Sequence, residues 1–178
     1  MPLKFLLFGV LGVALLISVL TDIASRRILD LVTWPAMAIC LLLRLWEEGL
    51  GDLEHGLVSG LVGVGGGAGL FALLAAWKKS FGWGDVKLMA AVGAAFGYPL
   101  IMAGLLFVSL TGALQAVVSL IWQGAVWDTL RGLIVGLGKK LKLTKETETQ
   151  ASRHIPYGVA IALGSVWAMW WDGTGGSH

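Results

Sequence analysis

Six apolar runs divide the chain, and short polar segments separate most of them. The runs are Leu3–Leu20, Leu31–Trp46, Gly56–Trp77, Val86–Phe96, Pro99–Trp122 and Ile155–Trp171. A membrane-crossing helix needs about 20 predominantly apolar residues, so the second and fourth runs are short. Only Gly97-Tyr98-Pro99 separates the fourth run from the fifth, but Gly and Pro together mark a break in a helix. The pattern predicts an all-α polytopic membrane protein with about six transmembrane helices.

The basic residues favour the same count of helices. The first, third and fifth connections, counted with Lys87 just beyond the third, hold 11 of the 13 Lys and Arg residues, whereas the second holds Glu47, Glu48, Asp52 and Glu54. Basic connections face the cytoplasm, which places both termini on the non-cytoplasmic side. If the fourth and fifth runs were one helix, the basic fifth connection would move to the opposite face. The charge pattern therefore selects six spans.

Composition excludes a soluble protein and indicates one membrane domain over residues 1–178. The chain is 57% hydrophobic and 13% charged, with a mean hydropathy of +0.82, whereas soluble domains have about 25% charged residues. The only long polar connection is a cytoplasmic loop at about residues 123–154. Its first part, 126–137, is apolar enough to form a helix on the membrane surface. The glycine-rich third run predicts close packing against another helix, because small residues let membrane helices approach.

Two aspartates stand out in this apolar chain. By the predicted topology, Asp22 at the end of the first helix and Asp85 at the start of the fourth lie at the same cytoplasmic face. Each alone has a plain structural interpretation: a solvated acid at a helix end, or for Asp85 a helix-capping group. Together, two facing carboxylates that share a proton can activate water and protonate a carbonyl oxygen, which is peptide hydrolysis.

Other catalytic chemistry finds little support. His55 and His178 are predicted outside, so only His154 shares the face of the two aspartates. Cys40 is the single cysteine and lies inside an apolar run, which excludes an internal disulfide, a Cys-x-x-Cys zinc site and a cysteine–histidine pair. We expect neither a metal nor a cofactor.

Three motifs resemble those of type IV prepilin peptidases, which are membrane aspartic proteases. Gly82-Trp83-Gly84-Asp85-Val86-Lys87-Leu88 resembles the family's GxGDxKL motif. Thr21-Asp22-Ile23 with Arg26-Arg27-Ile28 resembles its first aspartate segment, and Ile155-Pro156-Tyr157-Gly158-Val159-Ala160-Ile161-Ala162 resembles the motif that begins its last helix. One position departs: relatives usually have Ile-Pro-Asn after the arginines, and this chain has Ile28-Leu29-Asp30.

The resemblance implies a function. Members of the family cut the short basic leader from prepilins or prepilin-like proteins at the cytoplasmic face of the bacterial inner membrane, typically after a glycine. It implies that Asp22 and Asp85 are the catalytic pair. The partners would be the prepilin substrate and the lipid bilayer, with no nucleic acid. The chain resembles the short, peptidase-only form seen with Tad-type pili, and because it lacks the paired cysteines of longer relatives we expect no N-methyltransferase activity.

The remaining motif residues are weaker candidates for binding substrate or supporting the site. Lys87 has a plain interpretation as an interfacial lysine, and the two arginines as topology determinants. The candidates are Gly82, Gly84, Lys87, Arg26, Arg27, Pro156, Tyr157 and Gly158.

Three other functions remain open at this point. A proton-coupled transporter or channel could use Asp22 and Asp85 as relay groups, since acids within membranes commonly do so. A presenilin-type protease resembles the chain around Asp85, but there a tyrosine normally precedes the first aspartate, and here Thr21 does. An inactive relative acting as an assembly partner is disfavoured by the two retained aspartates.

Overall fold

The computed structural model describes residues 2–25, 29–77, 82–122 and 157–175, and the regular structure within these ranges is entirely helical. Each of the six predicted apolar runs forms a helix, with ends that differ from the prediction by up to five residues. The predicted surface helix at 126–137 lies outside the described residues. The helices are α1 (Pro2–Ser25), α2 (Asp30–Glu48), α3 (Gly56–Trp77), α4 (Trp83–Phe96), α5 (Leu100–Trp122) and α7 (Tyr157–Gly173).

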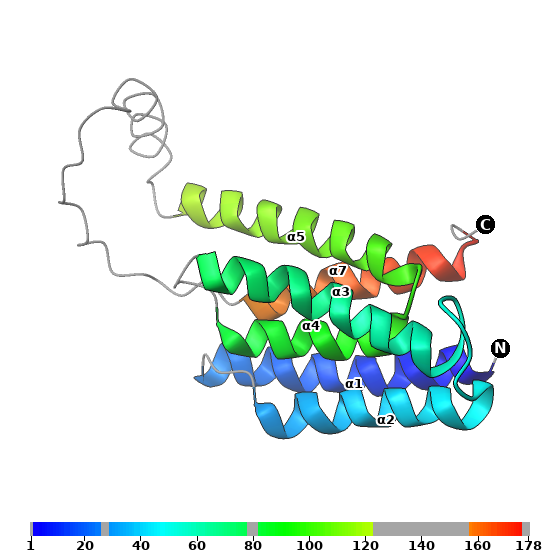
Figure 1. The fold of residues 1–178 in the computed structure, drawn as a ribbon. Coiled ribbons are helices and arrows are strands. Elements are labelled where there is room, and N and C mark those ends of the chain that lie inside the picture. Colours follow the sequence, from blue (N-terminus) through cyan, green and yellow to red (C-terminus); the bar gives the residue numbers. More distant parts are fainter. Residues whose placement is uncertain (1, 26–28, 78–81, 123–156, 176–178) are drawn as a thin grey trace. The chain divides into compact units, whose positions relative to one another are not determined.

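The chain divides into two compact units. The first comprises residues 1–112 and 156–178, and the second comprises residues 113–155, of which the described part is the C-terminal half of α5. In the first unit α1, α2, α3, α4 and α7 lie side by side, with successive helices from α1 to α4 running in opposite directions (Figure 1). α4 contacts α1, α2, α3 and α7, and every residue from Leu88 to Phe96 is buried. α4 is therefore the central helix of this unit.

Among the described helices, α3 and α4 have the most extensive contact, and glycines let their backbones approach closely. A Cβ atom at Gly67 would lie 2.5 Å from the carbonyl oxygen of Met89, and Gly63 meets the backbone of Gly93 at still closer range. Neither α3 glycine could carry a side chain without separating the two helices. The prediction that the glycine-rich run serves close packing is confirmed at these positions.

The turn between α4 and α5 is held by polar groups from α2 and α3. Arg44 of α2 donates from Nε to the carbonyl oxygen of Ala94 (3.0 Å) and from Nη2 to that of Ala95 (2.9 Å). Ser59 of α3 accepts from the Tyr98 backbone N–H (3.0 Å) and donates to the Tyr98 carbonyl (3.1 Å). Gly97 has a φ of 63°, which favours glycine. The fourth and fifth apolar runs are thus separate helices, as predicted.

Among the described residues, three helices are long and apolar enough to cross a membrane, which indicates a membrane protein. They are α1, α3 and α5, through the segments Leu3–Ala24, Gly56–Ala76 and Leu100–Ser119. α4 has 14 residues, which is about 21 Å of helix against a hydrocarbon core of about 30 Å. Six crossings, and the side on which the termini lie, therefore stay predictions.

Candidate active site

Asp22 ends a buried stripe along α1. Leu7, Leu11, Leu15 and Ser18 precede it at intervals of three or four residues, and their side chains are at most 3% exposed. This spacing puts all five residues on one face of a helix, the face that packs into the first unit. Asp22 is itself only 8% exposed, so its carboxylate lies in the interior and not on a solvated helix end.

A backbone N–H of α7 holds the Asp22 carboxylate. Gly158 lies in the first turn of α7, where N–H groups have no acceptor within their own helix, and its N–H donates to Asp22 Oδ2 at 3.0 Å. A Cβ atom at residue 158 would stand 2.7 Å from the same oxygen. Glycine at position 158 therefore lets the α7 backbone approach this carboxylate without displacing it.

Asp85 is buried in the first turn of α4. Asp85 is 8% exposed, and its backbone N–H donates to the carbonyl oxygen of Gly82 at 3.1 Å. A Cβ atom at Gly82 would lie 3.3 Å from Asp85 Oδ2, so the carboxylate folds back toward the residue that precedes the helix. A negative charge in this position is favoured by the N–H groups of the helix start. Gly84 lies between the two in the same turn and is half-buried.

The two aspartates lie at the same end of the first unit, where the end of α1 meets the beginnings of α4 and α7 (left side of Figure 1). Gly158 of α7 binds Asp22 there. The ring of the preceding residue, Tyr157, lies against Gly112 of α5, where an added Cβ would be 3.4 Å from Cε1. This end of the first unit therefore holds five of the predicted site residues: Asp22, Asp85, Gly82, Tyr157 and Gly158.

Lys87 follows Asp85 by two residues and forms an ion pair that the sequence analysis missed. Its Nζ lies 2.6 Å from Oδ2 of Asp30, the first residue of α2. In the sequence, Asp30 stands out only as a departure from the family pattern. The available signal was charge: an acid and a base occur at two helix starts predicted to face the same side.

Three predicted site residues, Arg26, Arg27 and Pro156, lie outside the described residues. Within the part of the chain that the structure describes, no three His, Cys, Asp or Glu side chains are grouped to hold a metal ion.

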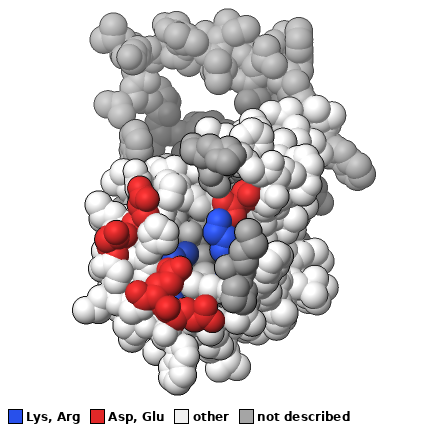
Figure 2. Space-filling view, turned by 90° about the vertical axis from the view of Figure 1, so that its right-hand side faces the viewer, with Lys and Arg blue, Asp and Glu red and all other residues white. Residues whose placement is uncertain are grey.

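A cavity of about 760 Å³ lies at the opposite end of the first unit and shares no residue with the aspartate site. Figure 2 faces this end and shows acidic side chains around a hollow that contains basic ones. Lys4 of α1 pairs there with Asp172 of α7 at 3.1 Å. The acidic and basic residues that line the cavity, counting histidine as basic, are Lys4, Arg44, Glu48, Glu54, His55 and Asp172.

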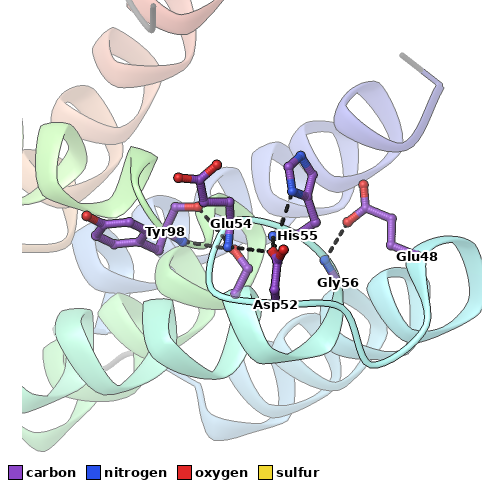
Figure 3. Close-up of polar contacts among 7 residues, drawn as sticks. Glu48, Asp52, Glu54, His55, Gly56 and Tyr98 are labelled. Carbon is purple, nitrogen blue, oxygen red and sulfur yellow. Dashed lines mark hydrogen bonds and ion pairs between the residues drawn. The ribbon is translucent and has the colours of Figure 1, made fainter.

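The connection between α2 and α3 at this end is closed by carboxylates (Figure 3). Asp52 Oδ1 accepts from the backbone N–H groups of Glu54 (3.0 Å) and His55 (3.1 Å), and Glu48 Oε2 accepts from that of Gly56 (2.7 Å). The two N–H bonds hold the pKa of Asp52 below its usual value, because they stabilise the ionised form. These bonds order a loop and lie far from Asp22 and Asp85.

One comparison with known proteins found a family that matches the chain. A family model described as the type IV leader peptidase family matches residues 9–117. The match includes Asp22 and the whole of Gly82–Leu88, and it ends before α7. No curated protein sequence and no solved structure matches the chain.

Proposed function

Since this chain belongs to the type IV leader peptidase family, we propose that it is a membrane aspartic endopeptidase that removes the leader peptide of type IV prepilins or prepilin-like proteins. Family membership makes it a peptidase of the leader-peptidase type. The observation that carries the aspartic mechanism is the placement of Asp22 and Asp85. Both aspartates are buried, both lie at one end of the first unit, and the Gly158 N–H of α7 donates to Asp22.

Two carboxylates are sufficient for the hydrolysis. The ionised carboxylate takes a proton from a water molecule, whose oxygen forms a bond to the scissile carbonyl carbon. The protonated carboxylic acid donates its proton to the carbonyl oxygen. When the tetrahedral intermediate collapses, the C–N bond breaks, the nitrogen leaves with a proton, and the two carboxyl groups again share one proton. We propose that Asp22 and Asp85 perform these roles as a pair.

The proposed site of action is the cytoplasmic face of the bacterial inner membrane. Asp22 precedes the first basic connection, and Asp85 follows the third. Basic connections stay in the cytoplasm, so the aspartate end of the bundle would face it. A substrate with a short polar leader and an apolar helix would present their junction at this depth. The proposed partner of this protein is then a prepilin-like chain of the kind processed in Tad-type pilus systems.

Isosteric replacement of each aspartate tests the proposal. Asp22→Asn and Asp85→Asn keep the side-chain volume but remove proton transfer, so we expect each to lower cleavage by at least about 100-fold. The measurement is the processing of a co-expressed prepilin-like substrate, followed by gel mobility, with the amount of enzyme in the membrane measured in parallel. Asp52→Asn, which replaces an aspartate at the opposite end, is the matched control and should cleave at the wild-type rate. Cleavage that persists in Asp22→Asn or Asp85→Asn would contradict the aspartic mechanism and favour the proton-relay alternative.

A further inference from the structure

The first turn of α7 reaches the Asp22 carboxylate, although Asp22 lies on α1. The Gly158 N–H donates to Asp22 Oδ2 at 3.0 Å, and a Cβ atom at residue 158 would stand 2.7 Å from that oxygen. We propose that this turn is the third component of the active site, and that Gly158 is a positioning residue whose N–H sets the orientation of the Asp22 carboxylate. The inference rests on the proposed aspartic peptidase function and adds to it the element that orients one carboxylate of the pair.

Glycine at position 158 is explained by Asp22 and not by the needs of the helix. Glycine within a helix costs up to about 1 kcal/mol relative to alanine, so α7 by itself would be more stable with alanine there. The Cβ of alanine would stand 2.7 Å from Asp22 Oδ2 and would force the carboxylate to turn away. The bond engages one carboxylate oxygen and sets the orientation of the other, which is the requirement for directing a water molecule.

Tyr157 holds the same turn against α5. A Cβ atom at Gly112 of α5 would lie 3.4 Å from Cε1 of the Tyr157 ring, which is ordinary van der Waals contact. Because Tyr157 directly precedes Gly158 in the chain, this contact helps to place the N–H that binds Asp22.

α7 is itself held firmly enough to serve as a reference. Thr111 of α5 donates to the carbonyl oxygen of Ala160 at 2.9 Å, one turn after Tyr157. At the far end of the helix Asp172 pairs with Lys4 of α1. α1 and α7 are thus joined at both ends, by Asp22 with Gly158 and by Lys4 with Asp172. These contacts fix the register of α7 against the helix that carries Asp22.

The first test is Gly158→Ala, compared with Gly164→Ala on the same helix. Gly164 packs against the Val108 backbone of α5, 2.5 Å from where a Cβ would lie, so its replacement reports the effect of a packing clash away from the aspartates. We expect Gly158→Ala to lower kcat by about 100-fold, the typical effect of displacing a catalytic group by about 1 Å, with KM within about threefold of wild type. Gly164→Ala should lower the thermal unfolding temperature more than Gly158→Ala does.

The second test removes the ring that holds the turn against α5. Tyr157→Ala should lower kcat by about tenfold, in the same direction as Gly158→Ala, whereas Tyr98→Ala, which changes the chain's other tyrosine at the opposite end, should have wild-type kcat. Wild-type kcat in Gly158→Ala or in Tyr157→Ala would overturn the inference. A loss of kcat matched by an equal loss of folded protein would also overturn it. Failure of the peptidase function itself would be seen separately, as cleavage that survives in Asp22→Asn and Asp85→Asn.

Discussion

At the scale of single residues, the ion pair between Lys87 and Asp30 has the clearest physical effect beside the site. A lysine in the first turns of a helix opposes the helix dipole, whereas an aspartate at a helix start is favoured by it. Asp30 begins α2 and Lys87 lies near the start of α4. Their contact at 2.6 Å offsets the poor placement of Lys87 and joins the beginnings of two helices two residues from Asp85.

This pair predicts a small but measurable coupling. The side chains of Lys87 and Asp30 are 35% and 58% exposed, and exposed pairs of this kind contribute about 0.2–1 kcal/mol. We expect Asp30→Asn and Lys87→Gln each to lower the free energy of unfolding by less than about 1 kcal/mol, and the double variant to be no less stable than the worse single one. Thermal unfolding in detergent measures this, with cleavage assayed alongside. Lys87→Gln that abolished cleavage while Asp30→Asn left it intact would show that Lys87 acts on the substrate or on Asp85 instead.

The catalytic candidates could be predicted from the sequence, and the motif resemblance pointed to Gly158, but the contact that joins Gly158 to Asp22 could not. Asp22 and Asp85 are visible because a buried carboxylate is rare in an apolar chain. The partner of Asp22 is a backbone N–H 136 residues away, and every residue but proline offers one. Arg44 was missed as a structural residue for the same reason. An arginine amid leucines signals a buried role, but its acceptors are main-chain carbonyl oxygens of α4, which depend on helix register.

At the scale of helices, the apolar runs predicted that each helix exists but not where each begins and ends. α4 begins at Trp83 and not at Val86. The three added residues, Trp83, Gly84 and Asp85, include two that a hydropathy pattern counts against a helix. Asp85 nevertheless stabilises the first turn through the N–H groups at the helix start. α1 likewise extends beyond Leu20 to include Asp22 within its final turns. The ends that hydropathy misplaced are those that carry the aspartates.

The α3–α4 contact predicts different outcomes for two glycines of one helix. Gly67→Ala would put a methyl group 2.5 Å from the Met89 carbonyl oxygen, whereas a Cβ at Gly69 meets nothing within 4 Å. Overpacking of this kind costs about 1–3 kcal/mol, so Gly67→Ala should be destabilised by that amount. Gly69→Ala should be unchanged or more stable by up to about 1 kcal/mol, because alanine favours the helix. Equal stabilities of the two variants in thermal unfolding would contradict the close approach of α3 and α4.

At the scale of the whole molecule, the three long apolar helices alone do not fix how many times the chain crosses the membrane. α4 is too short to cross by itself, but it is enclosed by α1, α2, α3 and α7 and need not span the lipid unaided. The Lys4–Asp172 pair puts the beginning of α1 and the end of α7 at one end of the first unit. Asp22, Asp85 and Gly158 lie at the other end. An even number of crossings accounts for both facts.

The predicted topology can therefore be tested at three single cysteines in a Cys40→Ala background. Leu53 and Thr174 are exposed in the structure and are predicted outside, whereas Lys142 belongs to the basic fifth connection and is predicted in the cytoplasm. A membrane-impermeant maleimide should label Leu53→Cys and Thr174→Cys in intact cells whose outer membrane is permeable, and Lys142→Cys only after the inner membrane is disrupted. The wild-type protein is the control, because Cys40 is buried and should stay unlabelled in both conditions. Labelling of Leu53→Cys and Thr174→Cys from opposite sides would show that the number of crossings between them is odd. Labelling of Lys142→Cys in intact cells would reverse the orientation and place the aspartates on the face where no cytoplasmic leader could reach them.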